Sequence, residues 1–307
     1  MWRQLKRHII NLEVHEIISI AMLVILSMIY GVGLEDESLI DEIIHIAWTA
    51  GPITLSITFL MIVFFVAAIC VKKGSFAIQA RLLCRVMASF LVMLVSFEAV
   101  IHYISARGLP LQDSLLQDWD KVLFFSKQPA EWLELINNTP LTLTLSAAYL
   151  SWFAFTYGTI FLMWLYGRKA LLEYTTAALT TFYVGYLIYI VVPAIGPIFT
   201  FTYSSKLGGL TAMMLDRKVF VPAADAFPSL HTGISIIMLI VVKKYARRWV
   251  WLYVPVMISI IAATIYLRIH YGVDVIAGVI LSLFIAWICP KLLAIWERER
   301  GGLSRPS

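Results

Sequence analysis

Residues 272–290 read GVDVIAGVILSLFIAWICP, an apolar run with one charged side chain, Asp274. A helix of about twenty residues crosses the hydrocarbon core of a bilayer, so this run predicts a transmembrane helix. Earlier parts of the chain contain further apolar runs of similar length. These lie at residues 17–33, 43–71, 84–104, 141–166, 171–192, 226–242 and 249–267. The sequence therefore predicts an all-α, polytopic membrane protein with about eight transmembrane helices.

The composition of the whole chain agrees with this class. Of its 307 residues, 61% are hydrophobic and 14% are charged, whereas soluble domains are about half apolar and about a quarter charged. The net charge is +5, and the Lys and Arg residues occur in short clusters at predicted helix ends. Such clusters are typical of membrane topology and argue against nucleic-acid binding. The three cysteines lack metal-ligand spacing, so we expect neither a disulfide framework nor a metal site.

The placement of Lys and Arg predicts the orientation of the chain. If the N-terminus is cytoplasmic, 17 of the 24 Lys and Arg residues fall on the cytoplasmic side. Because loops rich in Lys and Arg stay in the cytoplasm, we predict that both termini are cytoplasmic. In a prokaryote, the membrane that the chain spans would be the cell membrane. The long segments 105–140 and 193–225 then lie on the outer face.

The outer segment 105–140 contains an amphipathic pattern in which apolar and acidic residues alternate at helical spacing. The apolar positions are Leu111, Leu115, Trp119, Val122 and Leu123, and the acidic ones are Asp113, Asp118 and Asp120. This pattern predicts a helix in the membrane interface with its apolar face in lipid. A second short helical piece, from Trp132 to Ile136, is expected after Pro129.

A histidine follows a proline at the predicted start of the sixth span, in the stretch FPSLHT at residues 227–232. Pro228 suits the first helical turn, where its missing N–H costs nothing. His231 then lies in the opening turn, among N–H groups that have no intrahelical acceptor and that favour an anion. Ionisable residues inside apolar spans are costly, so each is a candidate for function.

A second histidine occurs in YLRIHYGVDVIAG at residues 266–278. His270 and Asp274 are four residues apart, which places them on one helix face if the helix begins by residue 270. A carboxylate bonded to one ring nitrogen orients the other as nucleophile or base. The predicted topology puts His231 and His270 on the same outer side. Two histidines suit phosphoryl transfer, in which one attacks phosphorus and the other protonates the leaving oxygen.

A metal is not expected in this site, because no third ligand accompanies the two histidines and a zinc hydrolase would need one. No other cofactor is indicated either. Several residues are candidates for binding the phosphate. Arg268 suits bidentate phosphate contacts, with an interfacial residue that reaches toward water as the alternative. Ser229 either donates to phosphate or caps the helix. Arg217 and Lys218 either reach a head group or are solvated loop charges.

Two further ionisable residues, Glu98 and His102, are four apart near the outer end of the third predicted span. They are candidates for recognising an acceptor alcohol or a head group, and an interhelical hydrogen bond is the alternative. The remaining histidines, His8, His15 and His45, are interpreted as surface residues.

The two histidine motifs resemble those of the type-2 phosphatidic acid phosphatase superfamily, which read PSGH and H-x-x-x-D and stand here as PSLH and HYGVD. The resemblance implies a six-helix core, a phosphohistidine intermediate and no metal. It makes His270 the nucleophile, Asp274 its orienting partner and His231 the general acid. It covers residues 84–290. The predicted organisation is a two-helix extension at 1–83, this catalytic core, and a cytoplasmic tail at 291–307.

The departures from that pattern point to one branch of the superfamily. The first motif, K-x-x-x-x-x-x-R-P, is absent; Thr264 stands where an arginine is expected, and Leu230 replaces the glycine of PSGH. FPSLH combined with Y-L-x-x-H-Y-x-x-D-x-I-A-G is similar to the inositolphosphotransferase branch, which includes the inositol phosphorylceramide synthases and bacterial relatives. The stretch PAIGP at residues 193–197 is also similar to bacterial members of this branch.

The sequence therefore predicts a membrane-bound lipid phosphotransferase whose active site faces outward and whose acceptor is an alcohol. A lipid phosphate phosphatase with water as acceptor is the alternative. A transporter would carry its binding residues near the midplane, often in inverted repeats, and here the candidates gather at one face. A structural membrane protein would need the three motif residues to be coincidental. The oligomeric state is left open.

Overall fold

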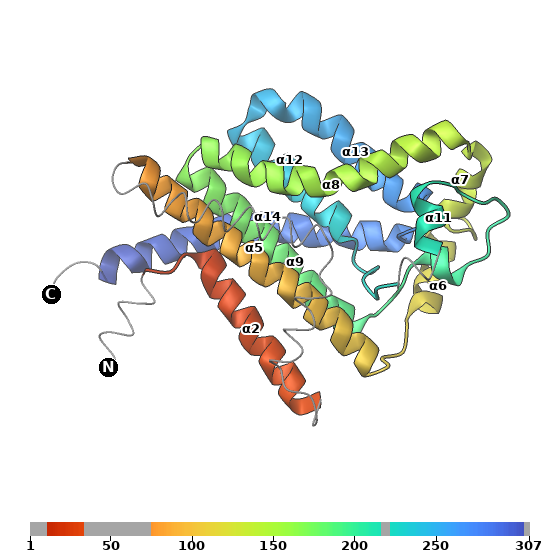
Figure 1. Ribbon diagram of the computed structural model, residues 1–307, viewed down its shortest axis with the longest axis horizontal. Coiled ribbons are helices and arrows are strands. Elements are labelled where there is room, and N and C mark those ends of the chain that lie inside the picture. Colours follow the sequence, from red (N-terminus) through yellow and green to blue (C-terminus); the bar gives the residue numbers. More distant parts are fainter. Residues whose placement is uncertain (1–10, 34–74, 216–221, 304–307) are drawn as a thin grey trace.

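The computed structural model describes residues 11–33, 75–215 and 222–303. The long helices are α2 (Val14–Gly33), α5 (Ser75–Ala106), α8 (Thr139–Leu165), α9 (Arg168–Val191), α12 (Leu230–Tyr245), α13 (Val250–Tyr266) and α14 (Gly272–Leu303). The short ones are α6 (Asp113–Leu123), α7 (Pro129–Leu133), η1 (Glu134–Ile136), α10 (Pro197–Thr200), α11 (Leu210–Leu215) and η2 (Arg247–Trp249). No strand occurs in these residues, so the predicted all-α class is confirmed (Figure 1).

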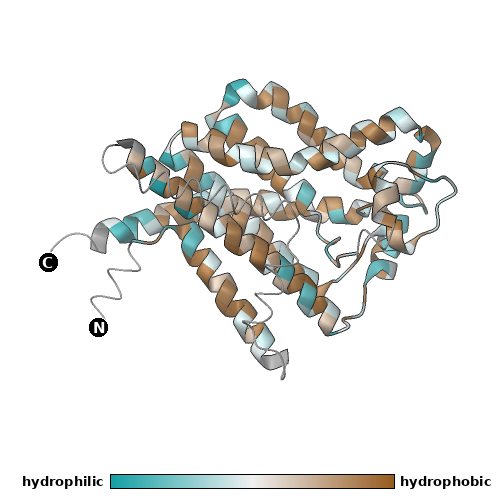
Figure 2. Cartoon of the chain, viewed as in Figure 1, coloured by the Kyte–Doolittle hydropathy of each residue, from teal (hydrophilic) through white to brown (hydrophobic). Residues whose placement is uncertain are grey.

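Within the described ranges, six helical segments are long and apolar enough to cross a membrane, which makes the chain an integral membrane protein. They are Val14–Gly31, Ala77–Ala106, Thr139–Leu165, Arg168–Val191, Arg247–Tyr266 and Gly272–Gly301. Hydrophobic residues run along most of their length (Figure 2). The predicted span at 43–71 lies outside the described residues, and α12 is shorter, with 16 residues. The domain boundaries predicted at 83/84 and 290/291 fall inside α5 and α14, and they stay predictions.

Helix α12 occupies the centre of the bundle and packs against α8, α9, α13 and α14. Its apolar side chains Ile234, Ile237 and Met238 are fully buried. Helix α14 approaches the N-terminus of α12 closely because residue 278 of α14 is glycine. A Cβ atom at this position would lie 2.4 Å from the carbonyl oxygen of Ser229, the N-cap of α12. The packing therefore brings the starts of α12 and α14, which carry the two histidine motifs, to one end of the bundle.

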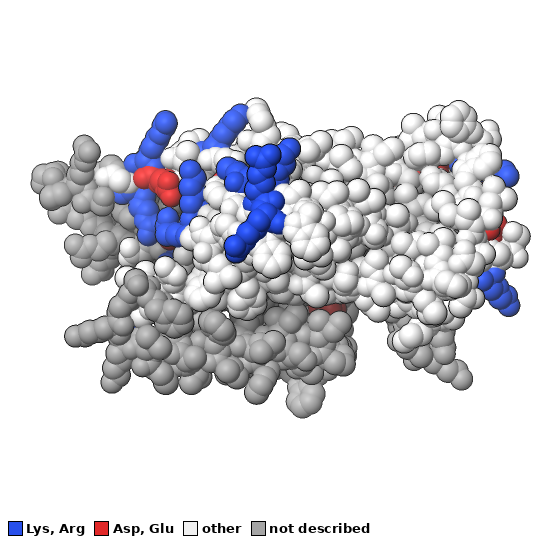
Figure 3. All heavy atoms as spheres, turned by 90° about the horizontal axis from the view of Figure 1, so that it is seen from above, with Lys and Arg blue, Asp and Glu red and all other residues white. Residues whose placement is uncertain are grey.

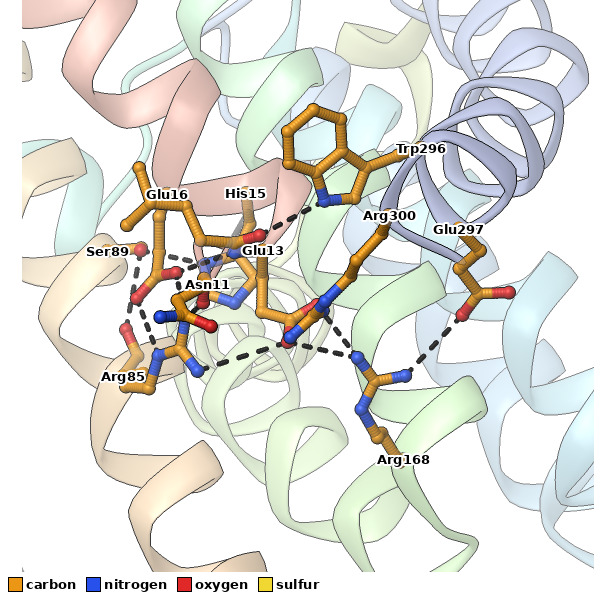
Figure 4. Close-up of polar contacts among 11 residues, drawn as sticks. Asn11, Glu13, His15, Glu16, Arg85, Ser89, Arg168, Trp296, Glu297 and Arg300 are labelled. Carbon is orange, nitrogen blue, oxygen red and sulfur yellow. Dashed lines mark hydrogen bonds and ion pairs between the residues drawn. The ribbon is translucent and has the colours of Figure 1, made fainter. Parts of the chain in front are cut away.

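Lys and Arg side chains gather at the opposite end, where α14 ends (Figure 3). A cluster of ion pairs there fixes α2 to the other helices (Figure 4). The Glu13 carboxylate, just before α2, accepts hydrogen bonds from Arg168 of α9 at 2.9 Å and from Arg300 of α14 at 3.0 Å. Glu16 of α2 accepts one from Arg85 of α5 at 2.8 Å. The basic end agrees with the predicted concentration of positive charge on one side, and its assignment to the cytoplasm stays a prediction.

The interpretation of His15 as a surface residue is wrong. Its side chain is fully buried, and its Nδ1 atom lies 2.9 Å from the hydroxyl of Ser89 on α5. Buried polar groups in proteins are generally hydrogen-bonded, and this contact joins α2 to α5 inside the bundle. His8 and His45 lie outside the described residues.

Candidate active site

The two imidazoles that we expected to converge are in contact. The Nε2 atom of His270 lies 3.4 Å from the Nδ1 atom of His231, and the ring centroids are 5.6 Å apart. His231 is the second residue of α12, as predicted. Pro228 precedes the Ser229 N-cap, however, so its predicted place in the first turn is wrong. His270 precedes α14, which begins at Gly272, so the condition for a helix face shared with Asp274, a helix that begins by residue 270, is not met.

A backbone carbonyl orients the His270 ring. Its Nδ1 atom lies 2.8 Å from the carbonyl oxygen of Ala226. Because a carbonyl oxygen accepts but cannot donate, Nδ1 carries the proton and Nε2 keeps a lone pair facing His231. The Asp274 carboxylate is farther from Nδ1, at 3.4 Å, and accepts the backbone N–H of Tyr271 at 2.8 Å. Asp274 therefore supports the His270 loop, and Ala226 makes the shorter contact with the ring.

The buried position of His270 keeps its ring neutral near pH 7. Burial lowers the pKa of His270 to about 4, against the opposing effects of the Asp225 carboxylate and the hydrogen bond to Ala226. A pKa below the usual value means that the unprotonated form predominates at neutral pH. The Nε2 lone pair is then available as a nucleophile.

The PAIGP segment holds the Ala226 carbonyl in place. The carbonyl oxygen of Ala194 accepts the backbone N–H of Ala226 at 2.9 Å. Next to it, Gly196 has a φ angle of +90°, and a Cβ atom there would lie 2.2 Å from the carbonyl oxygen of Ile269. Glycine is required for this backbone conformation and for the close approach. The segment thus packs against both histidine loops, a role that the sequence alone did not indicate.

Helix α6 matches the predicted amphipathic helix, and its apolar residues Leu115, Trp119 and Val122 are exposed. Its acidic residue Asp113 is buried and points into the protein. The Asp113 carboxylate accepts hydrogen bonds from the Gly196 N–H at 2.9 Å and from the Tyr271 hydroxyl at 2.8 Å. One side chain of α6 therefore joins the PAIGP segment to the loop that follows His270.

A second acidic residue of α6, Asp120, binds the start of α14. Its two carboxylate oxygens accept the N–H groups of Gly272 and Val273, each at 2.8 Å. Burial raises the pKa of Asp120, although these two hydrogen bonds act in the opposite direction. Free N–H groups in the first turn of a helix favour a carboxylate. Because Gly272 is two residues after His270, Asp120 helps to fix the position of His270.

We expect Asp120→Asn to lower kcat by about 10- to 100-fold with little change in KM, because small misplacements of a reacting group are costly. An asparagine oxygen accepts one of the two N–H groups without a negative charge. Asp118→Asn is the matched control, since the Asp118 side chain is 72% exposed and pairs with Lys121 on the same helix. Steady-state kinetics of both variants would check this. Equal kcat values for the two variants would contradict a positioning role.

Arg268, a predicted phosphate ligand, is engaged by other residues. Its guanidinium donates hydrogen bonds to the Ser205 carbonyl at 2.7 Å and to the Glu134 carboxylate at 3.1 Å, and it lies over the Tyr203 ring at 3.9 Å. The residue is 6% exposed, so the alternative of an interfacial residue reaching toward water is wrong. These contacts tie the loop after α10 to η1, and phosphate binding by Arg268 stays a prediction.

The other predicted phosphate ligands have different outcomes. Ser229 is the N-cap of α12, and its hydroxyl accepts the N–H of Thr232 at 3.3 Å, so the capping alternative is observed. Arg217 and Lys218 lie outside the described residues. The phosphate contacts of all three stay predictions.

An additional carboxylate, which the sequence did not single out as part of the site, lies beside the pair. Asp225 interacts electrostatically with His270, and burial raises the pKa of Asp225 to about 6. The charge of Glu98 on α5 acts on Asp225 in the same direction as burial. Glu98 is therefore near the site, as its predicted role in recognition requires. His102, one turn farther along α5, is half-buried.

No group of three or more His, Cys, Asp or Glu side chains is arranged to hold a metal ion in the described part of the chain. The expectation of metal-free chemistry stays a prediction.

Comparison with known proteins identifies the family. The sequence model of the PAP2 superfamily matches residues 114–288, more than half of the chain. The matched region begins in α6 and contains His231, His270 and Asp274. No curated protein and no solved structure matches the chain. With its two motif histidines in contact and the family model covering both of them, the chain belongs to the PAP2 superfamily.

Proposed function

We propose that this protein is a membrane lipid phosphotransferase that works through a phosphohistidine on His270. Membership of the PAP2 superfamily supports a lipid enzyme of the phosphatase or phosphotransferase type. The observation that carries the mechanism is the contact between His270 Nε2 and His231 Nδ1, with the His270 tautomer set by Ala226. One unprotonated nitrogen is thus presented beside a second imidazole that can carry a proton.

In the first step, the His270 Nε2 lone pair attacks phosphorus and the bond from phosphorus to the leaving alcohol breaks. His231 enters this step as the imidazolium, gives one proton to the departing oxygen and is left as the neutral imidazole. In the second step, an acceptor hydroxyl loses its proton to His231 and attacks phosphorus, and the phosphorus–nitrogen bond breaks. Reacting atoms lie about 3–3.5 Å apart before attack. Phosphorus would then lie between the two rings, so the 3.4 Å contact between His270 Nε2 and His231 Nδ1 has to open when substrate binds.

The acceptor distinguishes the two candidate activities, since the first step is common to both. The departures in the motifs, with Leu230 in PSLH and Thr264 before the nucleophile, are similar to the inositolphosphotransferase branch and favour transfer to an alcohol. Transfer to water would make the protein a lipid phosphate phosphatase. With both termini in the cytoplasm, the histidine pair would face the outer side of the membrane, where a lipid reaches it laterally.

Trapping the intermediate tests this mechanism. Purified protein in lipid nanodiscs is mixed with a panel of phospholipids and polyprenyl phosphates that carry ³²P, and the reaction is quenched in base. We expect an alkali-stable, acid-labile label on the protein, because the phosphorus–nitrogen bond of phosphohistidine hydrolyses in acid. The labelled peptide should contain His270. A donor that turns over without labelling the protein would contradict a covalent intermediate. Release of free phosphate would identify water as the acceptor, and formation of a new phosphate ester would identify an alcohol.

A further inference from the structure

A cavity of about 140 Å³ adjoins the two motif histidines. His231 and Leu230 form one wall, and the other walls come from α5, α8, α9 and the loop that carries Asp225. Aromatic rings make up most of the lining, namely Phe97, Trp152, Phe153, Tyr157, Phe182, Tyr186 and Tyr189. A cavity of about 150 Å³ holds a molecule of about six non-hydrogen atoms, as a benzene-binding cavity in another protein illustrates. This cavity therefore has room for a group of glycerol size.

The charges around the cavity exclude an anionic occupant. Asp225 contributes a carboxylate to the lining, and no Lys or Arg lines the cavity within the described ranges. Glu98 adds a second carboxylate that acts on Asp225. A phosphate inside the cavity would meet negative charge without a compensating cation, and burying an unpaired charge is expensive. The phosphate of a substrate therefore stays at His270, outside the cavity.

The His231 ring lies between His270, where phosphorus would bind, and the cavity. The ring packs against Tyr149 and Trp152 of α8, with ring centroids 4.5 and 4.4 Å away. Its Nδ1 atom faces His270, while its buried Nε2 atom has no hydrogen-bond partner among the described residues. A buried ring nitrogen without a partner is costly unless a ligand supplies one. In an in-line transfer, the alcohol oxygen lies on the far side of phosphorus from His270, which is where such a ligand would bind.

We propose that this cavity is the alcohol subsite of the enzyme: it takes a neutral, hydroxylated group of about glycerol size, and Asp225 selects it by accepting a hydroxyl hydrogen bond. His231 Nε2 contacts the oxygen that leaves or attacks, and the aromatic rings cover the carbon atoms. Because leaving and attacking alcohols use the same proton carrier, one subsite serves both steps. This inference rests on the proposed phosphotransfer and adds to it the class of alcohol.

One wall of this subsite, the wall from α5, lies outside the part of the chain that the family model describes. Met93, Leu94 and Phe97 line the cavity, and the match to the PAP2 superfamily begins at residue 114. A segment outside the matched region thus shapes the alcohol subsite. The selectivity of this protein for its acceptor is therefore a property of α5 together with Asp225.

The test first forms the ³²P-phosphohistidine and then follows its decay. Failure to form the covalent intermediate is therefore distinguished from failure of the alcohol subsite. Glycerol is added as the neutral probe, 2-amino-1,3-propanediol as its cationic analogue and glycerate as the anionic one. We expect glycerol to speed the decay and to appear as phosphoglycerol, and glycerate to have no effect. A monoacylglycerol in the nanodisc is compared with glycerol in water to distinguish a lipid source of the alcohol from a soluble one.

Two variants connect the result to the cavity. Asp225→Asn should lower the ratio of glycerol transfer to hydrolysis about tenfold, the effect of one charged hydrogen bond. Leu94→Trp should lower the same ratio because the larger side chain fills the cavity from α5 and leaves no room for glycerol. Asp118→Asn, an exposed carboxylate on α6, should leave the ratio unchanged. The subsite is refuted if glycerate speeds the decay of the phosphohistidine as much as glycerol does, or if 2-amino-1,3-propanediol speeds it more. It is also refuted if both cavity variants keep the wild-type ratio of transfer to hydrolysis while the phosphohistidine still forms.

Discussion

His270→Gln is expected to reduce turnover of the lipid substrate at least about 10⁴-fold, because the variant has no nucleophile to form the covalent intermediate. Glutamine is close to histidine in size, and its amide can still donate to the Ala226 carbonyl, which His270 Nδ1 contacts at 2.8 Å. The loop should therefore keep its place. The loss is measured as kcat/KM with the donor that labels the wild-type protein, together with the absence of label on the variant.

His15→Gln is the matched control for this variant. His15 is also fully buried and hydrogen-bonded, to Ser89, but it lies in the ion-pair cluster at the other end of the bundle (Figure 4). Size-exclusion profiles and circular dichroism of both variants would show that each is folded. If His270→Gln retains more than a few per cent of the activity, and carries the wild-type amount of ³²P label on another residue, another group is the nucleophile.

His231→Gln is expected to lower the rate of phosphohistidine formation from a lipid donor by about 10²- to 10⁴-fold, the usual contribution of a general acid. The physical reason is that an alkoxide is a poor leaving group unless it is protonated as it departs. The defect should largely disappear with a nitrophenyl phosphate ester, since nitrophenolate leaves without a proton. Single-turnover labelling with each donor separates the first step from the second, in which His231 acts as base.

The two donors serve as each other's control in this experiment. A variant whose phosphate position is distorted would lose activity with both of them. Loss of labelling from the nitrophenyl ester as severe as that from the lipid would therefore assign His231 to substrate positioning. A rate unchanged with both donors would remove it from the first step altogether.

Residue type and spacing identified the two motif histidines, and the fold confirms that they meet. The surroundings of the His270 ring were predicted less well. The spacing placed His270 on one helix face with Asp274 if the helix began by residue 270, whereas the helix begins at Gly272 and the ring contacts Ala226. Every residue except proline has the same backbone N–H and carbonyl groups, so a carbonyl that orients a catalytic ring leaves no mark in the sequence.

The acidic residues of α6 illustrate the same limit. The apolar spacing predicted an amphipathic helix, and Leu115, Trp119 and Val122 are exposed as expected. The spacing did not show that Asp113 and Asp120 bind backbone N–H groups around His270. An acidic residue opposite an apolar face is equally consistent with water and with buried amides. Only the position of the neighbouring segments distinguishes the two.

The sequence by itself determined that the chain lies in a membrane, is helical and carries two histidines at neighbouring helix starts. The length of an apolar run and the cost of charge in lipid depend on local composition, so they can be read along the chain. The tertiary structure decided which nitrogen of His270 is free, that Arg268 pairs with Glu134, and that α5 closes a cavity beside His231. These features join residues far apart in sequence, and their geometry exists only after the helices have packed.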